Sequence, residues 1–80
     1  MRLDKYLKVS RLIKRRTVAN EACDAGRVQI NGKTAKAGTV VKPGDIIEIA
    51  LGSGVLKAEI LTIAETVRKD DAKEMYRILS

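Results

Sequence analysis

The stretch "RVQINGKTA", residues 27–35, predicts a tight β-hairpin. Val28 and Ile30 alternate with polar residues, as in a strand with one buried face. Asn31-Gly32 follows at once, and this pair favours the two-residue turn in which both residues adopt positive φ. The predicted hairpin separates a helical part of the chain from a part rich in strands.

The first 26 residues have the apolar spacing of two short helices. Apolar residues at three- and four-residue steps predict a first helix over residues 4–12. A second helix is expected over residues 17–25, with Thr17 as its N-cap and Gly26 as a left-handed cap after its end. Its inward face is expected to consist of Val18, Ala22 and Ala25.

The chain after the hairpin is expected to form strands and tight turns. Pro43-Gly44 suits a type II turn. Residues 46–51 and 55–63 alternate as two strands, joined by the flexible "GSG" at 52–54. One helical stripe near the end predicts a short closing helix capped by Asp70 or Asp71. That stripe consists of Ala72, Met75, Tyr76 and Leu79.

These elements predict the α+β class, with two N-terminal helices packed on a small, mainly antiparallel sheet and a short C-terminal helix. Eighty residues suffice for one domain with a modest core, so we expect a single domain over residues 1–80.

The net charge of +6 lies entirely in the first fifth of the chain. Residues 1–16 contain seven Lys and Arg against one acid, Asp4, whereas residues 17–80 contain nine cations and nine acids. A solvated face would mix the two signs, so this excess favours a surface that binds a polyanion. The seven cations are Arg2, Lys5, Lys8, Arg11, Lys14, Arg15 and Arg16.

Several classes of site are disfavoured by composition. Cys23 is the sole cysteine and there is no His, which excludes an internal disulfide and a Cys/His zinc site. Cys23 lies among alanines in a helical stretch and is expected to be a buried thiol. No apolar run reaches the ~20 residues of a membrane span, and no glycine-rich phosphate loop is present. We therefore expect a cytoplasmic binding protein, not an enzyme, with no cofactor and no metal.

Four motifs in order resemble the S4 RNA-binding domain. They are "RLDKYL" at 2–7, Arg16-Thr17-x-Ala19, "GRVQING" at 26–32 and "VKPGDIIEI" at 41–49, which together cover about residues 1–50. The chain is most similar to small stand-alone S4 proteins of the RqcP (YabO) and Hsp15-like family. Its N-terminal segment and its ending "MYRIL" favour RqcP, because Hsp15 carries a longer basic C-terminal extension.

The resemblance implies a role in ribosome-associated quality control. RqcP-like proteins bind stalled large ribosomal subunits through large-subunit rRNA and peptidyl-tRNA. They support the alanine tailing of stalled chains by an RqcH-like NFACT protein, and we expect a monomer with no membrane partner. The alternative is a general rRNA- or tRNA-binding S4 protein of ribosome assembly or of heat-shock subunit recycling.

The residues favour recognition of RNA shape and phosphate. Only two tyrosines and no Phe or Trp are present, so a base-stacking platform is not expected. A DNA-reading helix-turn-helix is disfavoured because Glu21 and Asp24 lie on the second helix. A structural role as a ribosomal protein is a further alternative. The expected RNA-binding residues are Arg2, Lys5, Lys8, Arg11, Lys14, Arg15, Arg16, Thr17, Arg27 and Lys33.

Arg16 is the first candidate among these residues. The resemblance places it where S4 domains contact RNA, at the start of a helix whose free amides favour an anion. Alternatively, Arg16 only pairs with Asp4 to join the two helices. Both can hold, with Asp4 orienting the guanidinium group. Thr17 is equally well explained as a helix cap or as a phosphate ligand.

Overall fold

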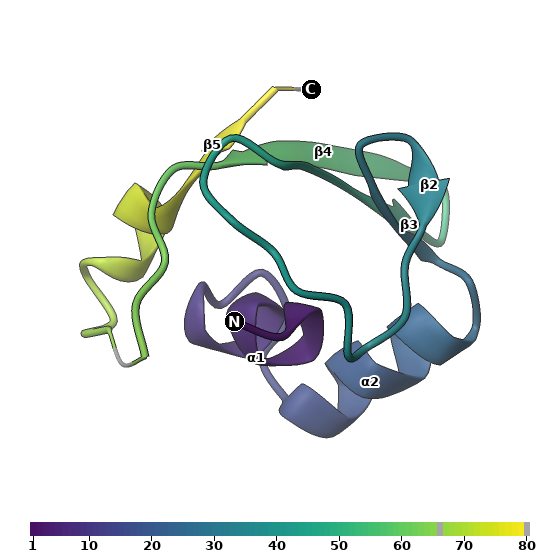
Figure 1. The fold of residues 1–80 in the computed structure, drawn as a ribbon, viewed down its shortest axis with the longest axis horizontal. Coiled ribbons are helices and arrows are strands. Elements are labelled where there is room, and N and C mark those ends of the chain that lie inside the picture. Colours follow the sequence, from purple (N-terminus) through teal and green to yellow (C-terminus); the bar gives the residue numbers. More distant parts are fainter. Residues whose placement is uncertain (66, 80) are drawn as a thin grey trace.

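Two short helices lie against one face of a five-stranded antiparallel sheet in the computed structural model (Figure 1). The structure describes residues 1–65 and 67–79. The elements are α1 (Leu3–Val9), α2 (Arg16–Asp24), β1 (Val28–Ile30), β2 (Lys33–Thr34), β3 (Ile46–Leu51), β4 (Gly54–Ile60), the 3₁₀ helix η1 (Ala72–Met75) and β5 (Tyr76–Ile78). The strand order is β2-β1-β3-β4-β5. The predicted α+β class is confirmed. Among the described residues, no helix is both long and apolar enough to cross a bilayer.

The predicted hairpin is confirmed and is tied to the next turn. Asn31 and Gly32 have φ of 52° and 83°, and Ile30 pairs with Lys33 across the turn. The Asn31 side chain accepts a hydrogen bond from the Ile46 amide at 2.9 Å and donates one to Asp45 at 3.1 Å. The hairpin and the Pro43-Gly44 turn are thereby held together.

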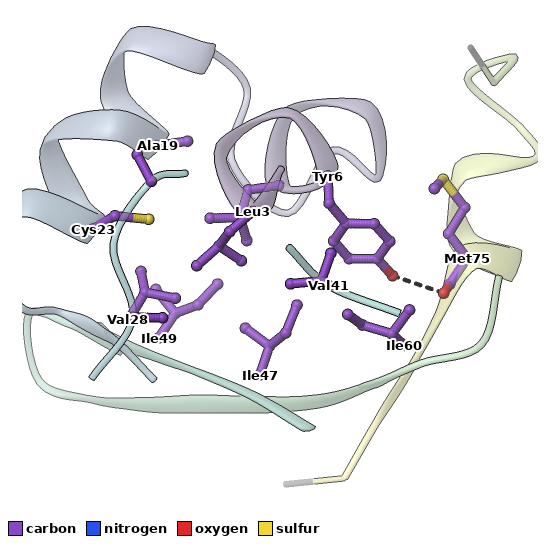
Figure 2. Close-up of a cluster of buried hydrophobic side chains, with 13 residues drawn as sticks. Leu3, Tyr6, Ala19, Cys23, Val28, Val41, Ile47, Ile49, Ile60 and Met75 are labelled. Atoms are coloured by element: carbon purple, nitrogen blue, oxygen red, sulfur yellow. Dashed lines mark hydrogen bonds between the residues drawn. The ribbon is translucent and has the colours of Figure 1, made fainter. Parts of the chain in front are cut away.

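The core lies between α1, α2 and the inner face of the sheet (Figure 2). From α1 come Leu3, Tyr6 and Leu7, and from the strands Val28, Ile47, Ile49 and Ile60, all fully or almost fully buried. The Tyr6 hydroxyl donates a hydrogen bond to the Met75 carbonyl oxygen at 2.8 Å. This bond attaches the C-terminal segment to α1.

The inward stripe of α2 differs in part from the predicted one: Ala22 packs against the core as expected, but Val18 and Ala25 do not. Ala19 and Cys23 are fully buried, whereas Val18 is 46% exposed and Ala25 is exposed. Both stripes have helical spacing, so only the position of α2 against α1 decides between them. Burial raises the pKa of the Cys23 thiol to about 11, with Asp4 and Asp24 adding to the effect. The thiol is buried, as predicted.

Two predicted helix ends are wrong. The first helix ends at Val9 and not at residue 12, because Arg11 adopts a left-handed conformation with φ of 65°. Thr17 is not an N-cap: Arg15 occupies that position without a side-chain cap, and Thr17 lies inside α2. Gly26 does follow the helix with φ of 77°, as predicted.

The predicted closing helix is confirmed only over its first turn, where Ala72 and Met75 are buried as expected. Only the four residues of η1 are helical, Asp71 makes no side-chain cap, and the chain continues as β5. Strand β5 pairs with β4, with Ile78 opposite Ala58 and Tyr76 opposite Ile60. Pairing satisfies backbone groups that β4 would otherwise leave free at the edge of the sheet. Leu79 is consequently 41% exposed instead of lying on a buried stripe.

The start of α1 is held by a segment distant in sequence. The Leu3 amide donates to the Thr39 carbonyl oxygen at 2.7 Å, and the Asp4 amide donates to that of Ala37 at 3.2 Å. In Figure 1 the connection between β2 and β3 passes beside α1. These bonds satisfy amides that a helix leaves free in its first turn and hold Asp4 in a buried position.

Candidate nucleic-acid interface

The Asp4 carboxylate lies at the centre of the strongest polar cluster of the two helices. It is only 2% exposed. Arg2 reaches it with Nε and Nη2, at 3.2 Å and 3.3 Å, and Arg16 Nε lies 3.4 Å from Oδ2. The Lys5 amide donates to Oδ1 at 2.8 Å and the Asn20 amide group to Oδ2 at 3.4 Å. One buried carboxylate thus organises two arginines from different elements.

The cluster holds Asp4 in its charged form. Burial opposes ionisation, but hydrogen bonds from Asn20, Arg16 and the Lys5 amide outweigh it and keep the pKa of Asp4 below its ordinary value of 3.8. A buried charge is tolerated only when it is paired in this way. At neutral pH the Asp4 carboxylate is therefore ionised and forms ion pairs with both guanidinium groups.

The two arginine side chains remain about half exposed, 53% for Arg2 and 49% for Arg16. A guanidinium has five N–H donors, so each arginine keeps donors that can face a ligand while others hold Asp4. Arg16 also lines a shallow hollow together with Thr17, Asn20 and Glu21. This arrangement orients cations on a rigid scaffold, which suits a phosphate group.

A second group of cations lies near Glu65, on α1 and just after its end. Lys8 and Arg11 are exposed and line a small hollow with Glu65 and Val67. Lys5 is half-buried and forms an ion pair with the Glu65 carboxylate. The same contact lowers the pKa of Glu65. The predicted cations of residues 1–16 therefore divide: Arg2 and Arg16 hold Asp4, whereas Lys5, Lys8 and Arg11 lie near Glu65.

The remaining predicted residues lie further along the molecule. Lys14 and Arg15 are exposed in the connection between the two helices. Arg27 follows the opposite end of α2 from Arg16, about 12 Å or more along the helix. It lines a hollow with the turn between β3 and β4. Lys33 is exposed on the edge strand β2. The structure thus gathers Arg2 and Arg16 around Asp4 but brings neither Arg27 nor Lys33 into the Asp4 cluster.

Two residues of this surface were not predicted. Asn20 lies four residues after Arg16 on α2, so its place on the same helix face could have been noticed from the spacing. Glu65 is distant from α1 in sequence, and no local pattern indicates its contact with Lys5. Among the described residues, no ion pair involves Lys8, Arg11, Lys14 or Arg15.

The family is decided by comparison with known proteins. The family model of the S4 domain matches residues 1–47 of the chain. The chain belongs to the S4-domain family. The Asp4 cluster lies in the matched part, since Arg2, Lys5, Arg16 and Asn20 all fall within it.

Relatives within the S4-domain family are similar over nearly the whole chain. The RQC P-site tRNA stabilizing factor of Halalkalibacterium halodurans is 56% identical over 98% of this chain and 89% of that protein. The factor of the same name from Bacillus subtilis is 51% identical over 99% of this chain and 92% of that protein. These matches confirm the predicted resemblance to the RqcP-like branch of the S4-domain family.

A solved structure confirms the S4-domain fold. The trimeric structure of Vibrio cholerae heat shock protein 15 superimposes with a TM-score of 0.92 at 31% identity, over 100% of this chain and 82% of that chain. Strand β5 and η1 therefore belong to a fold that both proteins share.

Proposed function

We propose that this S4-domain protein is an RNA-binding factor of ribosome-associated quality control. It binds large ribosomal subunits obstructed by peptidyl-tRNA and stabilises the tRNA while alanines are added to the stalled chain. The main support is its 56% identity, over 98% of its length, to a protein named RQC P-site tRNA stabilizing factor. The paired arginines of the Asp4 cluster supply a physical means of contacting RNA.

In this proposal the protein binds and does not catalyse. Arg2 and Arg16 contact phosphates of rRNA or tRNA with the guanidinium donors that Asp4 leaves free. Lys14 and Arg15, which directly precede Arg16, and the more distant Arg27 and Lys33 contribute a positive field that attracts RNA. An RqcH-like NFACT protein is the expected partner on the same particle, in the cytoplasm. The protein is expected to act as a monomer.

The experiment that tests this function is a pull-down of the tagged protein from cells in which translation is stalled. We expect large subunits, peptidyl-tRNA and an RqcH-like protein to be recovered together. Release of the protein by RNase would identify RNA as the bound component. Recovery with mature large subunits, regardless of peptidyl-tRNA, would contradict the quality-control role and favour a structural ribosomal protein.

A second candidate function is the recycling of ribosomal subunits after heat shock. It is favoured by the TM-score of 0.92 with heat shock protein 15 from Vibrio cholerae. The same pull-down separates the two functions when it is repeated after heat shock without stalling. Enrichment on subunits under heat shock alone, without an RqcH-like protein, would support this alternative.

Arg11 offers a prediction in which stability and binding change in opposite directions. Its φ of 65° is unfavourable for an arginine and natural for glycine. Arg11→Gly should therefore raise the free energy of unfolding by about 0.5–1 kcal/mol, after the greater freedom of glycine in the unfolded chain is subtracted. If Arg11 contacts a phosphate, the same variant should bind RNA more weakly and lower the log–log salt slope by about one.

Thermal unfolding and salt-dependent binding to large subunits measure the two effects. Arg11→Asn is the matched variant, because asparagine tolerates the left-handed conformation but carries no charge. A glycine variant that is more stable yet binds as tightly as the original protein would show that Arg11 is only a helix end.

A further inference from the structure

A second basic cluster lies beside the Asp4 cluster and is occupied by an acid of the same chain. Lys8 and Arg11 line a hollow of about 110 Å³ with Glu65 and Val67, roughly the volume of four water molecules. Lys5, three residues before Lys8 on α1, holds the Glu65 carboxylate in an ion pair. Glu65 thus pairs with one cation, Lys5, and shares a hollow with two others, Lys8 and Arg11, that make no ion pair with it.

Building on the proposed RNA-binding function, we propose that Lys5, Lys8 and Arg11 form a binding site for a backbone phosphate of RNA. The Glu65 carboxylate occupies the phosphate position while RNA is absent. A phosphodiester and a carboxylate each carry one negative charge and accept charge-assisted hydrogen bonds from lysine and arginine. Binding of RNA at this site displaces Glu65 from Lys5.

The Lys5–Glu65 ion pair is well suited to exchange. The Glu65 side chain is 74% exposed, and an ion pair in that position contributes little to stability because water solvates both partners. The Asp4 carboxylate is different, since it is buried and holds its partners through several hydrogen bonds. RNA has a further advantage over Glu65, because its phosphates release condensed counterions on binding.

The conformation of Arg11 provides an independent reason to assign a ligand to this site. Glycine is the usual residue at the left-handed position after a helix, yet the chain has arginine there. There is an alternative explanation for these two cations. Arg11 and Lys8 lie near the C-terminal end of α1, where positive charges stabilise the helix dipole without any ligand. The two explanations differ in what neutralising Glu65 should do to RNA binding.

Glu65→Gln tests the site directly. It keeps the size of the side chain and removes the competing charge, so Lys5 is free before RNA arrives. We expect binding to large ribosomal subunits carrying peptidyl-tRNA to become about 1.5- to 5-fold tighter, the range that corresponds to losing one exposed ion pair. Titration of labelled protein against these particles at fixed salt measures the change, and thermal unfolding verifies that the variant is folded.

Glu59→Gln is the matched control. It changes the net charge by the same amount and also removes an exposed ion pair, with Arg77. Glu59 lies on β4 between Ala58 and Ile60, whose buried side chains face the helices, so Glu59 is on the opposite face of the sheet. We expect its effect to be clearly smaller. Equal gains from both variants would reflect net charge alone and would overturn the site.

The Lys5→Gln change completes the test as a double-mutant cycle. If Glu65 competes with RNA for Lys5, losing Lys5 should cost more affinity in the Glu65→Gln protein than in the original one. Equal costs in both backgrounds would overturn the proposal. If the original protein does not bind the particles at all, the proposed function fails and this site with it. If the original protein binds and Arg16→Ala weakens it, but Glu65→Gln changes nothing, only this site is overturned.

Discussion

Replacing Arg16 with alanine should lower the affinity for large ribosomal subunits carrying peptidyl-tRNA by about 10- to 100-fold. This range corresponds to losing one hydrogen-bonded contact with a charged group, about 1.5–3 kcal/mol. The fold should tolerate the change. Arg2, Asn20 and the Lys5 amide still hold the buried Asp4 carboxylate, so losing Arg16 should lower the unfolding free energy by about 1–3 kcal/mol. The log–log salt slope should fall by about one.

The matched control for Arg16→Ala is Arg77→Ala. Arg77 is also an exposed arginine in an ion pair, with Glu59, but it lies on the sheet face away from the helices. Both variants lose one positive charge, so a general electrostatic effect should weaken them equally. A similar loss for the two variants would contradict a specific contact at Arg16, and so would unchanged binding of Arg16→Ala.

Turn chemistry explains which parts of the fold could be predicted. Asn31-Gly32 and Pro43-Gly44 carry their conformations in their own residue types, so neither turn depends on the rest of the protein. The pairing of Asp4 with Arg16 was also predictable, because both lie on short helices that must pack together. In these cases local chemistry and the tertiary structure favour the same arrangement.

Where tertiary contacts decide, sequence reasoning was wrong. The segment from Ala72 to Leu79 has helical spacing throughout, but only Ala72–Met75 are helical, and Tyr76–Ile78 pair with the free edge of β4. Arg11 ends α1 early through a conformation that arginine rarely adopts. The contact of Lys5 with Glu65 spans 60 residues, and no sequence pattern at either residue indicates it.

The assembly of the Asp4 cluster shows the same dependence. Asp4 is buried because the Ala37 and Thr39 carbonyl groups accept the first amides of α1, and this contact joins segments more than 30 residues apart. Arg2 was predicted as an RNA-binding residue, but its attachment to Asp4 required the structure. The orienting role of Asp4 therefore extends to two arginines, and this makes Asp4 the residue whose removal should affect the surface most widely.

Asp4→Asn should weaken RNA binding by about tenfold, one lost contact with a charged group, even though it makes the net charge more positive. Removing the one negative charge changes the net charge from +6 to +7, which by long-range attraction alone would favour RNA. With its NH2 group in place of Oδ2, asparagine would face Arg16 and Asn20 with a donor, so Arg16 would lose its acceptor and Arg2 would keep only the bond from Nε to Oδ1. The free energy of unfolding should fall by about 2–3 kcal/mol, because hydrogen bonds to a buried charged group are lost.

The pH dependence of stability gives a second measurement for Asp4→Asn. The pKa of Asp4 in the folded protein lies below its ordinary value of 3.8, so its stabilisation is complete above that value and is lost as the pH falls through the folded-state pKa. Asparagine does not titrate. The difference in unfolding free energy between the two proteins should therefore be constant near neutral pH and should narrow on acidification below about pH 4.

Asp45→Asn is the control for Asp4→Asn. It shows whether weaker RNA binding comes from misoriented arginines or from the loss of any buried carboxylate. Asp45 is also buried, and it accepts hydrogen bonds from the Asn31 side chain and the Lys42 amide. Its replacement raises the net charge by the same amount and also destabilises the fold. The ion pairs of Arg2 and Arg16 with Asp4 stay intact. We expect folded Asp45→Asn to bind RNA at least as tightly as the original protein.

If Asp45→Asn weakens RNA binding as much as Asp4→Asn does, the loss comes from destabilisation of the fold, and the Asp4 cluster has no special role. If only Asp4→Asn weakens binding, the buried carboxylate acts by directing the two guanidinium groups toward RNA.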